Sequence, residues 1–309
     1  MKISLKHYFN TYGLIVSLRC SVHFLFRFIR SYYPKRNPIL VNDLLMNVFP
    51  NDPGISKELS IFKIHEPINT KLISNLIKKN MTCIDIGGNI GYYAMLESKL
   101  VGEKGLVIVF EPVKKNYELF EKNIKLNNIQ NIISYNVACG NEEITTRFFE
   151  NVKSNGGKVL LDSEPIPLTS GTIKNVKVVI GDKIISQLEL SHIDFIRMDA
   201  EGYELKIIQG LEKTIRKFRP IISLELHKRQ LGIIGTKEFL LFFKSLGYHI
   251  DSYIPRDLDI PFIGTINDVE KFTIDKFLNL LENDKIPSFV MINLVNFKNQ
   301  YRPILDRKN

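Results

Sequence analysis

Between residues 81 and 226 the chain alternates short, mainly apolar runs with segments whose apolar residues recur every three or four positions. The first pattern predicts buried strands, and the second predicts amphipathic helices. Strands that alternate with helices favour a mostly parallel sheet with helices on both faces. We therefore predict an α/β fold, with strands at 81–86, 106–110, 132–137, 193–198 and 221–226 and helices at 92–99, 114–126 and 204–215.

The flanking segments predict further elements. A length of 309 residues suits one large α/β domain, alone or with an appendage. We predict a basic amphipathic segment at 1–40, a lead-in at 41–80 and the main domain at 81–309. The remaining predictions are short strands at 44–49 and 59–65, a helix at 69–79, β-hairpins at 144–180 with a loop at 153–158, helices at 236–246 and 274–281, and a strand at 289–295.

The N-terminal segment carries most of the excess charge. Residues 1–40 contain seven Lys or Arg and no Asp or Glu, in a chain whose net charge is +9. On a helix, Arg19, His23, Arg27 and Arg30 would form one stripe, with apolar residues over much of the remainder. Two interpretations stay open: a helix lying in a membrane interface, or a helix packed on the core with its basic side in water.

Other features bear on the compartment. The uncharged stretch at 8–18 is shorter than the about 20 residues that span a bilayer, so we expect neither a secretory signal nor a transmembrane helix. Cys20, Cys83 and Cys139 are odd in number and lack metal-ligand spacing, which favours a reducing compartment. We expect a cytoplasmic protein, with peripheral contact at the inner face of the membrane through residues 1–30 as the alternative. Nucleic acid is not an expected partner, because the main domain lacks a strong basic surplus.

The first strand of the alternation ends in a glycine-rich turn that contains Asp85, Gly87, Gly88, Asn89 and Gly91. In open parallel sheets ligands bind beyond the carboxyl ends of the strands, and glycines let the backbone turn tightly and approach a ligand. The spacing differs from the dinucleotide pattern G-x-G-x-x-G, because Asn89 stands where its second glycine would be. We interpret this turn as part of a site for a nucleotide-like ligand.

Glu111 follows the next strand, in the sequence Phe-Glu-Pro. A carboxylate at this place can accept hydrogen bonds from both ribose hydroxyls of an adenosine. Combined with the glycine-rich turn, Glu111 predicts that the ligand contains an adenosine with a free ribose.

Acidic residues and a histidine follow the last two strands. Asp199, Glu201 and Glu204 come after the strand at 193–198, whereas Glu225 and His227 end the strand at 221–226. Residues two apart on a strand share a face, so we expect Glu225 and His227 to point together toward the ligand cleft. Asp199 and His227 are candidate general bases, with Glu225 beside them, whereas Glu204 also fits simple helix capping.

The run from Asp85 to His227 resembles the FkbM family of methyltransferases. The resemblance covers about residues 45–250 and is most specific in the segment D-x-E-G-x-E at Asp199–Glu204, although Gly88 and Arg197 depart from the family's common Ala and Lys. It implies a Rossmann-like class I methyltransferase fold, with a mostly parallel seven-stranded sheet, a β-hairpin insertion and an N-terminal helical appendage. It also implies S-adenosylmethionine as methyl donor and a hydroxyl acceptor, often on a sugar.

On the basis of that resemblance, we assign roles to the residues that follow the strands. We assign Asp85 and the 87–91 turn to the methionine end of the donor, Glu111 to its ribose, and Asp199 or His227 to the base. The expected reaction is direct methyl transfer to a hydroxyl oxygen of a sugar or glycan. That glycan would be lipid-linked if residues 1–30 contact a membrane.

Several alternatives stay open. A divalent metal held by Asp199, Glu201 and Glu225 or His227 would lower the pKa of the acceptor, but we do not expect one. An RNA methyltransferase is the main alternative function, because these strand ends do not distinguish acceptors, although the chain has no Asn-Pro-Pro-Tyr motif. The glycine spacing argues against an NAD-dependent oxidoreductase. The carboxylates at two strand ends argue against a non-catalytic membrane-bound module.

Overall fold

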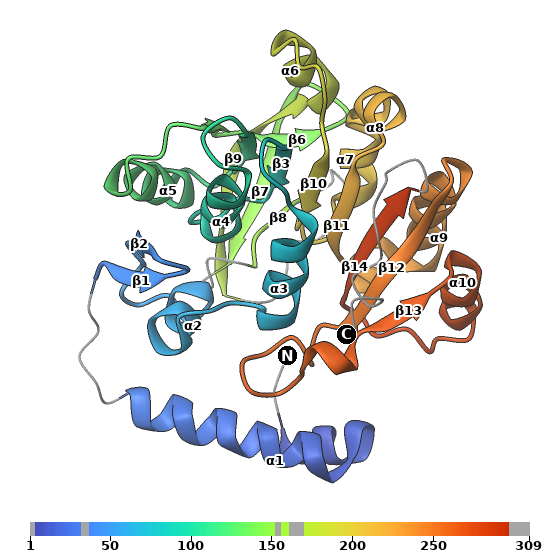
Figure 1. The fold of residues 1–309 in the computed structure, drawn as a ribbon. Helices are drawn as coiled ribbons and strands as arrows, with labels where there is room; N and C mark the ends of the chain where they lie inside the picture. The colour runs from blue at the N-terminus through green and yellow to red at the C-terminus, as the bar shows by residue number, and fades with distance from the viewer. Residues whose placement is uncertain (1–3, 32–36, 152–155, 161–169, 297–309) are drawn as a thin grey trace.

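The computed structural model describes residues 4–31, 37–151, 156–160 and 170–296 (Figure 1). A central eight-stranded sheet has the order β13-β12-β14-β11-β10-β3-β4-β5. Adjacent strands from β11 to β5 are parallel, whereas β14 pairs antiparallel with both β11 and β12. The strands are β3 (Thr82–Ile86), β4 (Leu106–Phe110), β5 (Ile132–Tyr135), β10 (Phe195–Met198), β11 (Ile221–Leu226), β12 (Tyr248–Pro255), β13 (Glu270–Phe272) and β14 (Val290–Asn296).

This sheet confirms the predicted α/β fold. The six strands predicted for this sheet are present, and β13 extends it by one short edge strand that the sequence pattern did not predict. The segment that forms β12 was not assigned either, because His249, Asp251 and Ser252 interrupt its apolar residues.

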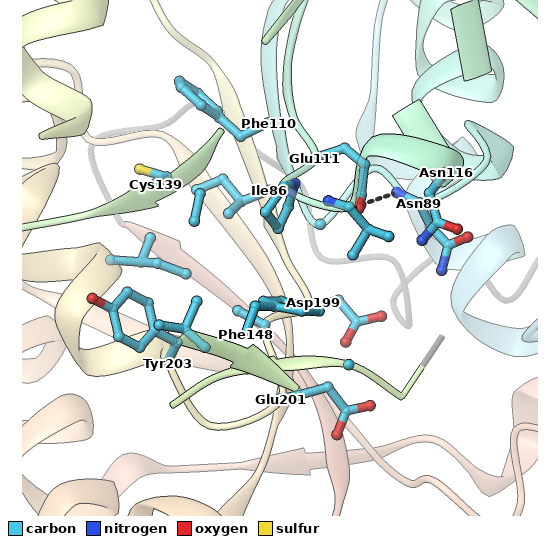
Figure 2. Close-up of a pocket in the computed structure, with 18 residues that line it drawn as sticks. Ile86, Asn89, Phe110, Glu111, Asn116, Cys139, Phe148, Asp199, Glu201 and Tyr203 are labelled. Carbon is cyan, nitrogen blue, oxygen red and sulfur yellow. Dashed lines mark hydrogen bonds between the residues drawn. The ribbon is translucent and has the colours of Figure 1, made fainter. Parts of the chain in front are cut away.

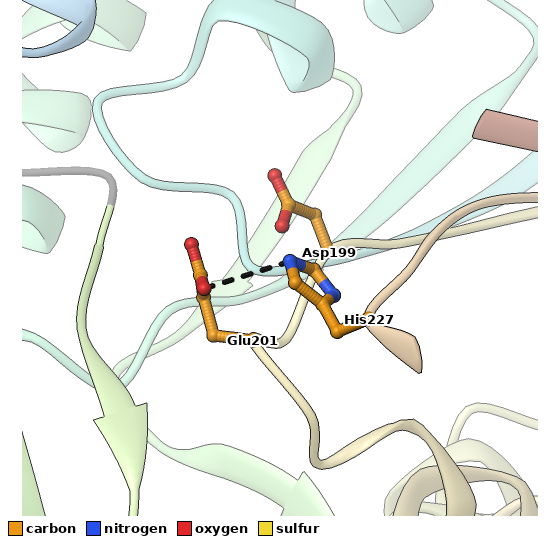
Figure 3. A group of neighbouring side chains, drawn as sticks. All are labelled: Asp199, Glu201 and His227. Atoms are coloured by element: carbon orange, nitrogen blue, oxygen red, sulfur yellow. Dashed lines mark ion pairs between the residues drawn. The ribbon is translucent and has the colours of Figure 1, made fainter. Parts of the chain in front are cut away.

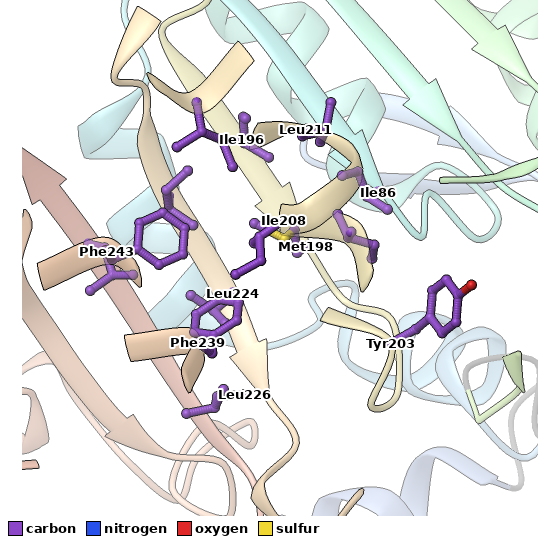
Figure 4. Close-up of a cluster of buried hydrophobic side chains, with 14 of the residues drawn as sticks. Ile86, Ile196, Met198, Tyr203, Ile208, Leu211, Leu224, Leu226, Phe239 and Phe243 are labelled. Atoms are coloured by element: carbon purple, nitrogen blue, oxygen red, sulfur yellow. The ribbon is translucent and has the colours of Figure 1, made fainter. Parts of the chain in front are cut away.

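Helices cover both faces of the sheet because alternate strand residues point to opposite sides. Cys83 belongs to one buried cluster and Ile84 to the other. On the Ile84 face, Phe239 and Phe243 pack against the strands (Figure 4), and burying each stabilises the fold by about 1.5–3 kcal/mol. The Cys83 face is covered by α3 (Pro67–Leu76), α4 (Tyr92–Val101) and α5 (Lys114–Leu126), and the Ile84 face by α7 (Glu204–Gly210), α8 (Glu212–Phe218), α9 (Lys228–Ser245) and α10 (Ile274–Glu282).

A second, four-stranded sheet confirms the predicted hairpin insertion. Its order is β6-β9-β7-β8, and α6 (Gly181–Gln187) follows it. Of the predicted loop at 153–158, residues 153–155 lie outside the described residues, and Lys158 belongs to a strand instead. The strands are β6 (Ala138–Gly140), β7 (Ile144–Asn151), β8 (Lys158–Val159) and β9 (Gly171–Ile180).

The lead-in differs from its prediction. It contains the hairpin of β1 (Ile39–Val41) and β2 (Leu44–Met46), but the predicted strand at 59–65 is wrong, because α2 (Ile55–Phe62) is a helix. Ile55 and Leu59 lie one helical turn apart and are both buried, which is the spacing of a helix rather than a strand.

Two helix boundaries also differ from the predicted ones. The predicted helix at 204–215 is divided at Leu211 into α7 and α8. The helix predicted at 236–246 begins at Lys228 and includes a break at Gly232, whose φ is +69°.

The N-terminal segment is helical, as predicted, and α1 (Leu5–Ser31) lies across the domain beside α2 (Figure 1). The hydroxyl of Tyr8 donates to the carbonyl of Asp257 over 2.7 Å, and His23 Nδ1 lies 2.8 Å from the carbonyl of Pro261. By length and composition alone, the stretch Leu5–Arg30 could also cross a membrane, which its interruption by Arg19 had led us not to expect.

Candidate functional site

A first cavity, of about 640 Å³, lies at the carboxyl ends of β3, β4 and β10 (Figure 2). This is the edge at which the sequence places its polar strand ends. Apolar side chains such as Ile86, Phe110 and Val113 form much of the wall, and Asn89, Glu111, Asp199 and Glu201 supply polar groups.

The glycine-rich turn is shaped by two close backbone approaches. Gly87 has φ +88°, and a Cβ there would lie 2.1 Å from the carbonyl oxygen of Asp199. A Cβ on Gly88 would lie 2.4 Å from Cγ1 of Val109, which explains why this chain has glycine where alanine is common. The turns after β3 and β10 therefore pack directly against each other.

Glu111 is held rigidly at the cavity wall. Its Oε2 accepts the backbone N–H of Asn89 over 2.7 Å, and its Oε1 accepts that of Val113 over 2.8 Å (Figure 2). The side chain of Asn116 also hydrogen-bonds to this carboxylate, and the lone pair that remains can accept a ligand hydroxyl. Burial raises the pKa of Glu111 to about 7, despite these hydrogen bonds. The carboxylate and the apolar wall fit an adenosine.

Asp85 does not line the first cavity, and neither do Gly88 and Gly91. Asp85 shares a strand face with Cys83 and points under α4, where it is fully buried. Its carboxylate pairs over 3.0 Å with Arg197, which stands opposite it in the sheet register. The assignment of Asp85 to direct donor contact is therefore corrected to a positioning role, whereas Gly87, Asn89 and Glu111 do reach the cavity.

Arg197 connects the buried Asp85 to Asp199 in the wall of the first cavity. Its second terminal nitrogen lies 3.2 Å from Asp199, and its guanidinium stacks over the ring of Tyr93 at 4.0 Å. Because one terminal nitrogen pairs with Asp85 and the other with Asp199, the guanidinium bridges the two carboxylates and fixes Asp199 relative to β3. Lysine, the common residue here in the family, offers no such planar fork.

A second cavity, of about 1090 Å³, adjoins the first at Glu201, which lines both. Glu225 and His227 both line the second cavity, as their spacing on the strand predicted. The other walls come from segments far apart in the sequence: His23 and Arg27 of α1, Lys57, Glu58, Ile61 and Phe62 of α2, Pro53, Gly54, Arg256, Ile260 and Phe289.

His227 stands between two carboxylates. Its Nδ1 lies 2.6 Å from Glu204. Its Nε2 lies 3.5 Å from Glu201, the ion pair that Figure 3 marks. Burial alone would lower the pKa of His227, but Glu204, followed by Glu225 and Glu201, raises it well above its ordinary value. The neighbouring carboxylates thus favour the protonated imidazole, and Glu204 orients His227, so that Glu204 is more than a helix cap.

Glu201, which the sequence analysis named only as a candidate metal ligand, lines both cavities. Burial raises the pKa of Glu201 to about 8, and His227 opposes that shift. Glu201 has φ +51° and precedes Gly202 at φ +102°, so a sharp turn directs its side chain to the junction of the cavities. The Glu-Gly pair in the D-x-E-G-x-E segment was the available signal for this turn.

A metal could be held at the junction by Asp199, Glu201 and His227, each of which offers a ligand atom within 4.8 Å of the others. Glu225, which we had named as a metal ligand, instead pairs with Arg256 over 3.2 Å. An ion pair between Glu201 and His227 also explains why these two side chains lie close together. The geometry therefore permits a metal cation without requiring one.

The lead-in contributes an ion-pair chain below the second cavity. Arg256 pairs with Glu66 over 2.9 Å, Glu66 with His65 over 3.1 Å, and His65 with Glu58 over 3.0 Å. The sequence His-Glu-Pro at 65–67 marked this place, but no pattern indicated its partner Arg256, which directly follows β12. These pairs connect the lead-in to Glu225 and so to the site.

Comparisons with known proteins agree with this geometry. The model of the methyltransferase FkbM domain matches residues 85–250. Methyltransferase 1 of Beauveria bassiana is 22% identical over 192 residues, which cover 57% of this chain and 76% of that protein. The crystal structure of methyltransferase FkbM from Methylobacillus flagellatus aligns with a TM-score of 0.44 at 16% identity, over 75% of this chain and 49% of that one. Aeropyrum pernix fibrillarin, with natively bound S-adenosylmethionine, aligns with a TM-score of 0.41 at 12% identity, over 74% of each chain.

This chain thus spans about half the length of the Methylobacillus protein chain. The matched region of 85–250, in a chain of 309 residues, contains the glycine-rich turn, Glu111 and the junction residues Asp199, Glu201 and His227. The chain belongs to the FkbM family of S-adenosylmethionine-dependent methyltransferases.

Proposed function

We propose that this methyltransferase acts on a hydroxyl oxygen of a sugar or glycan, with the donor in the first cavity and the acceptor in the second. The observation that carries the proposal is the place of Glu201, whose side chain lines both cavities. Direct transfer requires donor and acceptor to meet within bonding reach, and the junction is where the two cavities meet.

The donor side is held by groups of this chain. S-adenosylmethionine supplies a methyl group activated by a positively charged sulfur. Glu111 accepts the ribose hydroxyls, the turn at Gly87 brings backbone close to the ligand, and Asp199, fixed by Arg197, adds a carboxylate to the same wall. None of these groups has to move a proton.

Proton removal falls to Glu201. The bound donor would supply an electrophilic methyl group to the acceptor oxygen and leave as the neutral thioether, and the Glu201 carboxylate would accept the proton of the acceptor hydroxyl. A pKa of about 8 makes Glu201 a stronger base than an ordinary carboxylate and keeps it near the working pH. His227, held by Glu204, keeps that carboxylate at the junction.

The walls of the second cavity support a hydroxyl-rich acceptor. Glu58, Glu225 and Glu201 offer hydrogen-bond acceptors, and the rings of Phe62 and Phe289 offer apolar surface. A few polar groups on an otherwise apolar wall are what orients a small polar ligand.

The test is a turnover assay with S-adenosylmethionine and a panel of glycans, lipid-linked sugars and RNA, with the methylated atom identified by mass spectrometry and NMR. We expect a sugar methyl ether and a rate that rises with pH through about 8. Glu201→Gln should lower turnover by about 100-fold or more while S-adenosylhomocysteine still raises the melting temperature.

Glu212→Gln is the matched control, because Glu212 forms an exposed pair on α8 away from both cavities. Methylation of RNA, with no sugar accepted, would replace the proposal. Loss of turnover with a chelator and recovery with Mg²⁺ would reassign Asp199, Glu201 and His227 to a metal site.

A further inference from the structure

The outer face of α1 is apolar. Leu14, Leu18, Val22, Leu25 and Ile29 are spaced by four, four, three and four residues, which places them in one row along the helix. Each side chain is between 46% and 61% exposed. Ile15 and Phe28 are also exposed and widen the row. A contiguous apolar surface of this kind marks a contact with a partner or a membrane.

The inner face of α1 is firmly attached to the domain. Val16, Cys20 and His23 are buried, and Tyr8 and His23 contact backbone carbonyls after β12. The predicted basic stripe therefore does not face water as a whole: His23 is buried, and the next basic residue along it, Arg27, lines the second cavity. A helix packed on the core with an outward basic face was one expectation, and the structure has the apolar face outward instead.

We propose that α1 lies in the plane of an anionic lipid bilayer, with its outer row among the acyl chains, and that the second cavity receives the phosphate-bearing headgroup of a lipid-linked sugar. This deepens the proposed function and rests on it for the identity of the acceptor. A helix that crossed the bilayer would have to give up the contacts of Tyr8 and His23, whereas a helix in the plane keeps them.

The charge of the segment favours an anionic surface. Residues 1–40 carry seven basic side chains and no acidic one. Basic residues close to a membrane surface are attracted to anionic lipids, and an interfacial helix binds through buried apolar area together with that attraction.

Two cationic side chains of the second cavity favour a phosphate-bearing acceptor, in a lining that also contains Glu58, Glu201 and Glu225. Arg27 comes from α1 itself and Lys57 from the neighbouring α2, and both line the cavity that contains Glu201. Within the part of the chain that the structure describes, no carboxylate forms an ion pair with Arg27 or Lys57. These two cationic side chains lie on or beside α1 and can form ion pairs with the phosphate that links a sugar to its lipid.

The test is co-sedimentation of the full-length protein with vesicles of phosphatidylcholine alone and of phosphatidylcholine with phosphatidylglycerol. We expect binding to the anionic vesicles that weakens with salt. The double variant Leu18→Glu, Leu25→Glu should lower the partition coefficient by about tenfold or more, because two apolar side chains leave the interface.

The matched control is Ile234→Glu, which also replaces an exposed apolar side chain, on α9. It should bind vesicles like the wild-type protein. Both proteins should keep the rise in melting temperature with S-adenosylhomocysteine, which shows that they are folded.

Failure of this inference and failure of the proposed function differ in outcome. Absence of vesicle binding, with sugar methylation retained, would overturn the membrane contact alone. Vesicle binding without methylation of any sugar would support the membrane contact of α1 and refute the proposed sugar acceptor. A dimer that the Leu18→Glu, Leu25→Glu variant dissociates, without vesicle binding, would reassign the outer row of α1 to a second copy.

Discussion

The two cavities of this protein are built in different ways. The first is formed chiefly by turns that directly follow neighbouring parallel strands, and its shape depends on backbone contacts such as that of Gly87 with Asp199. The second is assembled from α1, α2, β11 and the end of β12, and ion pairs such as Glu66–Arg256 connect its walls. The comparison teaches that the first cavity, the proposed donor side, is set by the fold itself, whereas the second, the proposed acceptor side, is set by side chains brought together from distant segments.

The largest expected effect is that of Gly87→Ala on the donor side. The new Cβ would lie 2.1 Å from a backbone oxygen that cannot move freely, at φ +88°. We expect a loss of stability on the order of 4 kcal/mol and loss of S-adenosylhomocysteine binding, measured by urea unfolding and calorimetry. Gly235→Ala is the control, since its Cβ would lie 3.5 Å from Leu231 and helix propensity would rise. Similar stability for the two variants would refute the close approach.

The next effect concerns the acceptor side, where Glu204→Ala removes the buried partner of His227. Breaking a buried ion pair from one side costs about 3 kcal/mol. Because the pKa of His227 is raised in the folded state, this stabilisation is present below the ordinary pKa of histidine and is lost as pH rises through the folded value.

The stability of wild type and Glu204→Ala should therefore converge at alkaline pH in urea titrations. Glu212→Ala, which removes an exposed pair, should change stability by about 0.5 kcal/mol or less. A constant difference between wild type and Glu204→Ala at every pH would show that the pair does not hold a proton.

A smaller effect is expected from Glu111→Gln. The pKa of about 7 means that Glu111 gains its full acceptor capacity for ribose hydroxyls only as pH rises through 7. Affinity of wild type for S-adenosylhomocysteine should rise up to about tenfold between acidic and mildly alkaline pH, measured by calorimetry. The variant should bind more weakly and show no such rise, whereas an identical pH profile in both proteins would remove Glu111 from the ribose site.

The smallest effect is expected from Arg27→Ala in the second cavity. Losing one partly solvated cation should raise KM for a phosphate-bearing acceptor by roughly threefold to tenfold. Turnover at saturation and S-adenosylhomocysteine affinity should stay unchanged, because Arg27 lies outside the first cavity. Lys6→Ala, on the same helix but outside both cavities, should leave KM unchanged, and an equal change in both variants would point to general charge rather than a specific contact.

The sequence predicted the strands around the first cavity well because their signals are local. Apolar runs identified β3, β4, β10 and β11, and polar residues at their ends identified the cavity edge. The exception is Asp85, which was expected at that edge but lies buried, and whose partner Arg197 depends on sheet register. Register is a tertiary property that local periodicity does not contain.

The acceptor side could be predicted only in pieces. Glu225 and His227 were correctly placed together, since strand alternation is local. The protonated state of His227 follows from Glu204 on another element, and the role of Glu201 follows from a left-handed turn at its junction. Neither the contact of α1 with Asp257 nor the pair Glu66–Arg256 has a local signal.

The close contact between Gly87 and the carbonyl of Asp199 has a consequence for how such an enzyme can acquire new substrates. The turn after β3 and the turn after β10 are in direct backbone contact, so a substitution in either would disturb the other. Under the proposed function, acceptor specificity can instead change in the walls that α1 and α2 contribute to the second cavity. Replacing those two helices is the route by which a designer could redirect the methyl group to a different acceptor while leaving donor recognition intact.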